Sequence, residues 1–231
     1  MPLNRFDLHL HTEFSPDCDT ALAGIEAHCF AMGLTGIAVT DHDTIEGGLR
    51  LRDKAKTLQI IVSEEITTRD GDVVGLFLRE RIPPKLSALE TIAAIHAQNG
   101  LAYLPHPFDK QRARKSGGAS LSEIIGPVDI VETFNGKVGR ERYNTLAAEY
   151  ALANHKIAGG GSDAHSLRAI GTVYNEIELP ENYAYDDAQI FLEAMKTARI
   201  VGERRSPLGG LVVIGRRPIT LALRRLRGIP K

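Results

Sequence analysis

Two histidines near the amino terminus have a type and spacing that suit metal chemistry. His9 and His11 stand in the phrase DLHLHT (residues 7–12), at the end of an apolar run that predicts a first β-strand over residues 3–10. Alternate residues of a strand face the same side, so both imidazoles point one way. Neutral imidazole is a good ligand for zinc, iron and manganese. The pair therefore forms half of a metal site, and its partners must come from elsewhere in the chain.

Side chains of the same ligand types recur where later apolar segments end. The set contains five imidazoles and three carboxylates but no thiolate: His9, His11, Asp17, His42, Glu65, His106, Asp163 and His165. Nitrogen and oxygen donors of this kind suit Mn, Zn or Fe. A tetrahedral zinc takes about four ligands, counting water. The set therefore implies two or three divalent metal ions, with a carboxylate such as Glu65 shared between them.

Neighbouring divalent ions favour one class of reaction. They hold the attacking and leaving oxygens of a phosphoryl displacement and generate hydroxide at neutral pH. The ligands thus predict hydrolysis of a phosphate ester by attack of a metal-bound hydroxide. Asp163 and His165 are expected to be catalytic as well as ligating. Either would protonate the leaving oxygen only if released from its ion, so metal-bound water is the alternative.

Charge on the phosphate oxygens requires a cationic partner in the transition state. Lys137 is the preferred catalytic cation, because it closes the phrase Asn135-Gly136-Lys137 at the end of an apolar segment. The residues expected to bind substrate are Lys137, Arg112, Arg114, Arg140 and Asn135. Asp41, beside His42, is expected to orient a ligand. Glu132 is interpreted as a carboxylate at the edge of the core, paired with a basic group.

Composition places these residues in an ordinary folded protein. The chain has 231 residues, of which 43% are hydrophobic and 25% charged, with a formal net charge of −1. Such a charge predicts no global attraction to nucleic acid or membrane. Cys18 and Cys29 cannot build a disulfide framework. Neither a signal peptide nor an apolar run of about 20 residues is visible, so we expect a soluble, cytoplasmic protein.

The ligands are carried by strands that alternate with helices. Strands are expected over residues 3–10, 36–40, 60–62, 73–78, 101–104, 128–131, 156–158 and 173–179, with helices between them and a late helix over residues 187–199. This alternation predicts an α/β fold with a parallel sheet. Because nearly every strand end contributes a ligand, a closed barrel is favoured over an open doubly wound sheet.

Two regions are distinguished along the chain. Residues 1–202 form the predicted barrel, and residues 203–231 form a short basic C-terminal extension. This extension contains Arg216, Arg217, Arg224, Arg225 and Arg227. It is either a patch for nucleic acid or an anionic membrane, or a solvated helix face or tail, and the second interpretation is favoured.

Six phrases together resemble the PHP (polymerase and histidinol phosphatase) superfamily. They are DLHLHT, TDHD, EEI, PHPF, ETFNGK and GSDAH, in the family's order, over roughly residues 7–171. The resemblance implies a distorted seven-stranded (βα)7 barrel with a metal cluster in its mouth, and phosphoesterase activity. It also favours Glu65 over Glu64 as a ligand.

The resemblance further implies how the ligands divide. Residues matching His9, His11, Glu65 and Asp163 hold one metal, those matching Asp17, His42 and His165 hold another, and the residue matching His106 helps hold a third. Val74 stands where trinuclear members usually carry a histidine. The site around His106 is therefore short of a ligand.

Three functions stay open from the sequence. The first is hydrolysis of a small phosphate monoester, perhaps a nucleotide. The second is a nuclease acting on short oligonucleotides or RNA ends, for which the basic loop at residues 110–115 and the basic extension leave room. The third is a metal-binding module without turnover, which the missing ligand at Val74 would favour. The substrate, the number and kind of ions and the oligomeric state are not fixed by the sequence.

Overall fold

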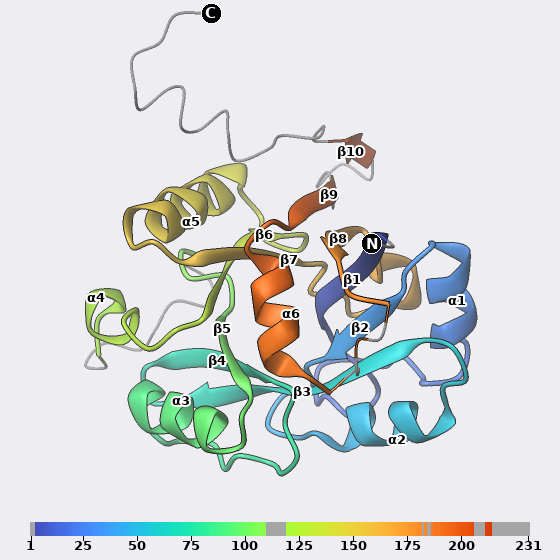
Figure 1. Ribbon diagram of the computed structural model, residues 1–231, viewed down its shortest axis with the longest axis horizontal. Coiled ribbons are helices and arrows are strands. Elements are labelled where there is room, and N and C mark those ends of the chain that lie inside the picture. The colour runs from blue at the N-terminus through green and yellow to red at the C-terminus, as the bar shows by residue number, and fades with distance from the viewer. Residues whose placement is uncertain (1–2, 110–118, 182, 184–185, 206–210, 214–231) are drawn as a thin grey trace, which may run out of the picture.

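A computed structural model describes residues 3–109, 119–181, 183, 186–205 and 211–213 (Figure 1). Its strands are β1 (Leu3–Leu10), β2 (Gly36–Val39), β3 (Gln59–Thr68), β4 (Gly71–Leu76), β5 (Leu101–Leu104), β6 (Ile130–Asn135), β7 (Ile157–Gly161), β8 (Val173–Glu178), β9 (Arg199–Arg205) and β10 (Leu211–Val213). Its helices are α1 (Ile25–Ala31), α2 (Glu46–Lys54), α3 (Ala88–Ala97), α4 (Leu121–Ile124), α5 (Glu141–Ala153) and α6 (Ala188–Met195), with a 3-10 turn η1 (Leu167–Ala169).

Some predictions concern residues that the structure does not describe. Arg112 and Arg114, expected to bind substrate, lie outside the described residues, as does the basic extension from residue 214 onward. The expected boundary between residues 202 and 203 falls inside β9. The division into a barrel and an extension therefore stays a prediction.

The described strands form one ten-stranded sheet in the order β10-β9-β8-β1-β2-β3-β4-β5-β6-β7. Parallel pairing joins β1 to β2, β2 to β3, β5 to β6 and β6 to β7. By contrast, β4 runs antiparallel to both neighbours, and β8 runs antiparallel to β1 and β9. The α/β class is confirmed, whereas the expected distorted seven-stranded (βα)7 barrel is wrong in strand number, and the sheet is mixed instead of parallel. One reason is local: Arg69 and Asp70 alone join β3 to β4, and so short a link connects only antiparallel strands.

The same hairpin changes where Glu65 lies. The apolar run over residues 60–62 predicts a strand that stops before Ser63, but β3 continues to Thr68 because β4 extends its pairing. Glu65 thus lies within a strand, directly opposite Val74. The neighbouring Glu64 points to the other face, where its Oε2 accepts the backbone N–H of Ile82 at 2.9 Å.

The sheet curls until β7 lies beside β1, and backbone bonds nearly close it. His11 donates its N–H to the carbonyl of Ala164 at 2.9 Å, and Asp163 donates its N–H to the carbonyl of His9 at 2.7 Å. Close approach is possible because residue 161 is a glycine. A Cβ at Gly161 would lie 2.3 Å from the Cβ of His9.

Two buried side chains seal the remaining seam. Asp7 on β1 accepts the backbone N–H groups of Ser162 and Gly171, each at 2.9 Å. Asn175 on β8 accepts the N–H of Gly160 at 2.9 Å and donates to the carbonyl of Phe6 at 3.0 Å. Side chains thus supply the hydrogen bonds that a regular β1–β7 ladder would have made.

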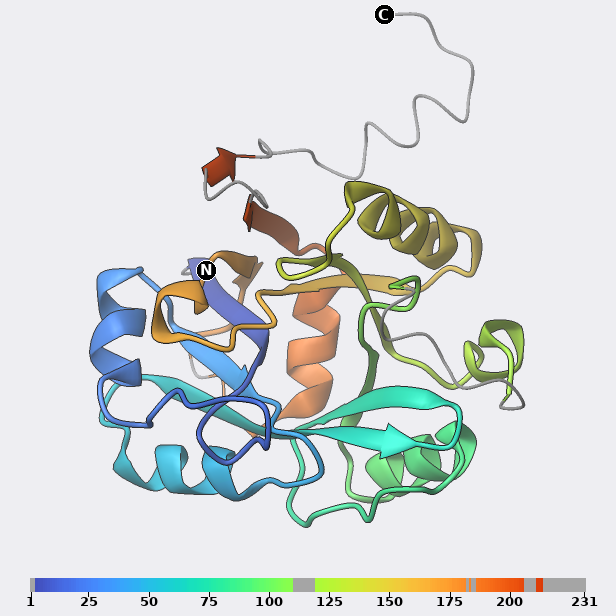
Figure 2. The ribbon, with the colours of Figure 1, turned by 180° about the vertical axis from the view of Figure 1, so that it is seen from behind.

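Helix α6 closes one end of this barrel-like sheet. It crosses the middle of the molecule in both views (Figures 1 and 2). Its Phe191 is fully buried in one apolar cluster with Leu101 and Ile130, the residues at which β5 and β6 begin. The end at which the parallel strands begin is therefore filled with apolar side chains, and polar groups are left for the other end.

The remaining helices cover the outside of the sheet. Ser87 caps the start of α3, where its hydroxyl accepts the N–H of Glu90 in a capping box. Buried residues of α1 and α2 pack in one cluster with Ile37 and Val39 of β2. Among the described residues, no helix has the length and apolar content that crossing a bilayer would require.

Candidate metal centre

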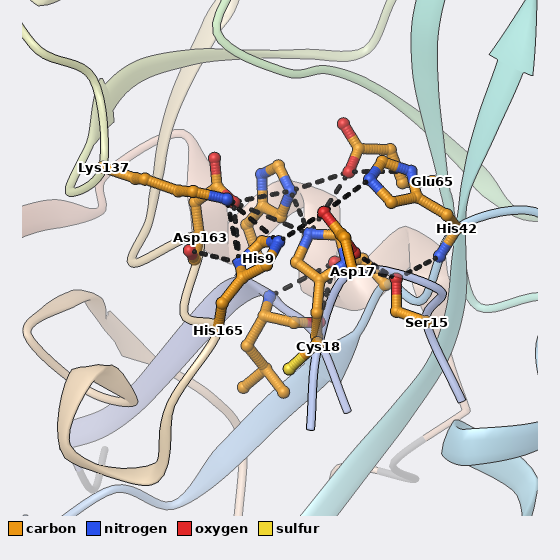
Figure 3. A network of polar contacts seen from close by, with 12 residues as sticks. His9, Ser15, Asp17, Cys18, His42, Glu65, Lys137, Asp163 and His165 are labelled. Atoms are coloured by element: carbon orange, nitrogen blue, oxygen red, sulfur yellow. Dashed lines mark hydrogen bonds and ion pairs between the residues drawn. The ribbon is translucent and has the colours of Figure 1, made fainter. Parts of the chain in front are cut away.

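All eight side chains predicted to bind metal meet where the parallel strands end. Figure 3 labels all of them but His11 and His106. Among the described residues their ligand atoms form four overlapping groups of three, and within each group the atoms lie within 4.8 Å of one another. The groups are His9–Glu65–His106, His9–His11–Asp163, His11–Asp17–His165 and His11–His42–Glu65. The fold therefore brings together the residues that were predicted from the sequence, while their role as ligands stays a prediction.

The innermost atoms of the cluster are two imidazole nitrogens and two carboxylate oxygens. His9 Nε2 lies 3.3 Å from His11 Nε2 and 3.2 Å from Glu65 Oε2. His11 Nε2 lies 3.3 Å from the same oxygen and 3.6 Å from Asp163 Oδ1. All four side chains are buried. Electron-rich atoms packed this closely away from water require bound cations or protons between them.

Glu132 fixes the orientation of His9 from behind. Its Oε1 lies 3.0 Å from His9 Nδ1. Because a carboxylate only accepts, Nδ1 carries a proton, and Nε2 faces Glu65 as the nitrogen that an ion can bind once it displaces the proton there. The same Oε1 accepts the hydroxyl of Tyr103 at 3.0 Å, and Oε2 accepts the backbone N–H of His106 at 2.7 Å. The basic group that pairs with Glu132 is thus the imidazole of His9, a predicted ligand, and the same carboxylate also supports His106.

A buried nitrogen of His42 gives a second indication of a bound cation. His42 Nδ1 has no hydrogen-bond partner within the described part of the chain and lies 3.6 Å from Glu65 Oε2. A buried polar atom left this way costs free energy unless something binds it. The donors of the whole cluster are imidazole nitrogens and carboxylate oxygens, which Mn, Zn and Fe accept. The residues present therefore fit divalent ions.

Asp17 and His165 form the more open side of the cluster. His165 Nε2 lies 2.8 Å from Asp17 Oδ2, and His42 Nε2 lies 3.7 Å from the same oxygen. Partial burial would raise the pKa of Asp17, but hydrogen bonds from His165 and Ser15 lower it to about 2. Asp17 is thus a carboxylate at neutral pH, as metal binding requires.

The group around His106 has fewer donors. His106 Nε2 lies 3.1 Å from Glu65 Oε1, and His9 completes the group. Val74, directly opposite Glu65, is fully buried in the apolar cluster of the barrel with Tyr103. An apolar side chain therefore occupies the place where a fourth donor from β4 would stand.

A cavity of about 420 Å³ opens beside the cluster. Lys137, Asp163 and His165 form part of its wall, together with Ser166 and Thr172. Lys137 Nζ lies 3.6 Å from Asp163 Oδ1 and 2.9 Å from His165 Nε2. The ammonium group thus stands where the cavity meets the predicted ligands, a place suited to neutralising a bound anion.

The other residues expected to bind substrate have different positions. Asn135 is 1% exposed, and its Nδ2 donates to Glu132 Oε2 at 2.9 Å and to Asp163 Oδ2 at 3.0 Å. It therefore lies behind the cluster, contrary to the expectation of substrate contact. Arg140 is exposed directly before α5 and follows Gly139 of the cavity wall, but it is not itself one of the residues that line the cavity.

Asp41 supports the segment that follows His11. Its carboxylate accepts the backbone N–H of Thr12 at 2.6 Å and the Thr12 hydroxyl at 2.7 Å. It therefore fixes the chain directly after a predicted ligand, and its expected role of orienting a ligand stays a prediction. Ser15 is a contacting residue that the sequence did not indicate, and the contacts of Glu132 with two predicted ligands were not predicted, although its position in the phrase ETFNGK could have indicated a role.

Comparison with known proteins identifies relatives of this chain. A family model described as PHP domain matches residues 7–154, and one described as PHP-associated matches residues 141–200. The uncharacterized protein MJ0417 of Methanocaldococcus jannaschii is 32% identical over 173 residues, which cover 74% of this chain and 69% of that protein.

Two solved structures share the fold. A two-domain protein from Bacteroides vulgatus that contains a predicted PHP-like metal-dependent phosphoesterase matches with a TM-score of 0.70 at 17% identity, over 87% of this chain and 65% of that one. The lesion-specific endonuclease PfuEndoQ from Pyrococcus furiosus matches with a TM-score of 0.62 at 17% identity, over 87% and 58%. This chain spans less than two thirds of either structure. Since the PHP domain model covers the segment that carries six of the eight predicted ligands, the chain belongs to the PHP domain family.

Proposed function

We propose that this chain is a metal-dependent phosphoesterase that hydrolyses a small phosphate monoester, such as a nucleotide. One observation carries the proposal: nitrogens of His9 and His11 and oxygens of Glu65 and Asp163 converge beside the ammonium group of Lys137. Divalent ions bound there would polarise the phosphate oxygens and activate water at neutral pH.

The chain's own residues would share the remaining work. Lys137 Nζ would neutralise charge that builds on the phosphate oxygens. Asp163 would stay a carboxylate that holds the centre together. His165, whose side chain is 17% exposed, faces the cavity and Asp17, so it can hold a proton near the leaving oxygen when no ion occupies its ring nitrogen. The cavity would take the organic part of the ester, with Ser166 and Thr172 as polar contacts.

The first test is a substrate panel with chelated and reloaded protein. We expect hydrolysis of p-nitrophenyl phosphate or mononucleotides with Mn or Zn, and loss of that activity in EDTA. His9→Ala and Asp163→Ala should reduce turnover to background while the far-ultraviolet circular dichroism spectrum is retained. Near-normal turnover in either variant would contradict the assignment.

The second candidate is a nuclease, which the likeness in fold to an endonuclease favours. The same panel separates the candidates when short RNA and DNA oligomers are added. Hydrolysis of oligomers without hydrolysis of monomers selects the nuclease. Tight metal binding with no turnover on any substrate selects a binding module.

A further inference from the structure

Ser15 is uncharged and is not among the predicted ligands, yet its hydroxyl touches three ligand-bearing segments. Its Oγ lies 3.2 Å from His11 Nδ1, 2.9 Å from Asp17 Oδ1 and 3.2 Å from the backbone nitrogen of His42 (Figure 3). Ser15 is 4% exposed, so water hardly competes for these contacts. The hydroxyl thus joins the end of β1, the loop after β1 and the loop after β2.

Counting protons assigns a direction to each of these hydrogen bonds. A hydroxyl has one proton and two lone pairs. The carboxylate of Asp17 only accepts, so the Ser15 proton goes to Asp17. The backbone N–H of His42 occupies one lone pair. The other lone pair therefore accepts from His11, and His11 Nδ1 carries a proton.

This protonation aims His11 into the metal centre. With Nδ1 protonated, the lone pair of His11 lies on Nε2, which is 3.3 Å from Glu65 Oε2 and 3.6 Å from Asp163 Oδ1. His11 belongs to three of the four groups of possible ligands. A ring turned the other way would withdraw a donor from each of them.

We propose that Ser15 is a positioning residue of the metal centre, which holds His11 with Nε2 toward the ions and holds Asp17 beside them. The proposal rests on the metal centre of the proposed function. Partners that hold a ligating histidine in one orientation typically contribute about 10- to 100-fold to metal affinity. The expected contribution of Ser15 lies in that range.

The hydroxyl of Ser15 is separable from the fold. The backbone N–H of Ser15 donates to the carbonyl of Thr12 at 2.9 Å, and its carbonyl accepts the N–H of Cys18 at 3.2 Å. Both bonds survive in Ser15→Ala. Ser63→Ala is a matched control, because Ser63 is buried on β3 and its hydroxyl donates to the carbonyl of Ile61 at 3.1 Å, not to the cluster.

The test is Mn²⁺ and Zn²⁺ titration of the metal-stripped full chain by calorimetry. Ser15→Ala should weaken binding by about 10- to 100-fold, Ser15→Thr should retain most of the affinity, and Ser63→Ala should match the wild type. Far-ultraviolet circular dichroism spectra of the metal-free variants should agree with one another at the temperature of the titration, which separates the loss from unfolding.

Two results would overturn the proposal. One is equal metal affinity in Ser15→Ala and the wild type. The other is a ¹⁵N spectrum of the zinc-loaded wild type in which His11 binds through Nδ1. Metal binding that depends on Ser15 without any phosphoester hydrolysis would instead contradict the proposed function and support the role of Ser15.

Discussion

His9 and Glu65 illustrate how the buried centre distributes its protons. Burial alone would lower the pKa of His9, but the carboxylates of Glu132, Asp163 and Glu65 outweigh it and hold the pKa well above its ordinary range. Burial would raise the pKa of Glu65, yet the surrounding imidazoles hold it well below its ordinary range. The metal-free centre therefore keeps a proton on His9, and a bound ion must displace it.

Glu132→Gln tests the support behind His9. Four donors face this carboxylate: His9 Nδ1, the Tyr103 hydroxyl, the His106 N–H and the Asn135 amide. An amide would turn its own N–H₂ toward two of them. We expect metal affinity to fall by about 10- to 100-fold and the free energy of unfolding to fall by about 1–3 kcal/mol. Calorimetry and urea denaturation measure the two effects.

The matched control is Glu178→Gln, a solvent-exposed glutamate at the end of β8. It should leave both quantities unchanged. Unaltered metal affinity in Glu132→Gln would mean that His9 keeps its orientation without this carboxylate.

The ligands and their supporting residues differ in how far the sequence predicts them. Imidazoles and carboxylates that follow apolar segments can be recognised in the sequence as candidate metal ligands, and the six family phrases give their order along the chain. Ser15 carries no such signal and Glu132 carries only its place in the phrase ETFNGK, because a serine in a loop and a glutamate in a strand acquire their roles only through partners elsewhere in the chain. The buried position of Asn135 likewise depends on tertiary contacts.

Among the elements, α6 fills the end of the barrel-like sheet at which the parallel strands begin. The ring of Phe191 is fully buried, with ring centroids 5.2 Å from Phe6 and 5.3 Å from Phe77. Phe191→Ala should lower the free energy of unfolding by about 3–5 kcal/mol, because the burial of the ring is lost and its removal leaves an unfilled space in the core. Urea denaturation at neutral pH measures this.

Ile190→Ala on the same helix is the control, since Ile190 is 37% exposed. Its effect should stay within about 0.5 kcal/mol. Equal losses of unfolding free energy in the two variants would show that α6 stabilises the protein through its helix propensity and not through the burial of Phe191.

Glu26 joins α1 to the segment that leads into β3. Its Oε1 accepts the backbone N–H groups of Lys56, Thr57 and Leu58 at 2.8, 2.8 and 3.2 Å, and these bonds lower its pKa to about 2. Because the folded pKa lies below the ordinary value of 4.5, the stabilisation is present above pH 4.5 and is lost as the pH falls toward 2.

Glu26→Gln should therefore lower the urea midpoint at pH 7, and the difference should shrink steadily as the pH falls below 4.5. Since the carboxylate of Glu26 lies at the surface, the effect is small, and midpoints measured from pH 7 to 3 are compared with those of Glu46→Gln. A constant difference across that range would exclude the charge as its origin.

The sequence did not predict the ends of elements that are fixed by pairing with other strands. The late helix was expected over residues 187–199, but α6 ends at Met195 and the chain continues as β9. Arg199 there donates its Nε to Glu176 on β8 at 2.6 Å. Pairing with β8, which lies before α6 in the chain, stabilises β9, and no local sequence pattern indicates this pairing. The antiparallel directions of β4 and β8 were not predicted for the same reason.

For the whole molecule, the protons on His9 and His11 affect both metal binding and the stability of the fold. In the metal-free protein the folded pKa of His9 lies above its ordinary value of 6.5, and that of His11 is raised too, because hydrogen bonds to Asp163 and Glu65 outweigh burial. Their stabilisation is therefore complete below pH 6.5 and is lost as the pH rises through the folded pKa. His165 has a lowered pKa, from burial and from His11 and Lys137 nearby, and opposes this trend only below pH 6.5. From pH 7 to 9 the slope therefore comes from the buried pair and, near pH 7, also from Glu64, whose pKa burial raises to about 7. The contribution of Glu64 cancels when loaded and stripped protein are compared at the same pH.

We expect the melting temperature of the metal-stripped protein to fall from pH 7 to 9. With Mn²⁺ held at a fixed excess, the ion replaces the proton on His9, and fewer competing protons at higher pH mean tighter binding. The ion adds about 2.7 kcal/mol when its free concentration is about 100 times Kd, and more as Kd falls. The gap between loaded and stripped melting temperatures, followed by scanning fluorimetry, should therefore widen with pH. A gap that narrows would mean that the ions bind without displacing these protons, and that the imidazoles of β1 are not ligands.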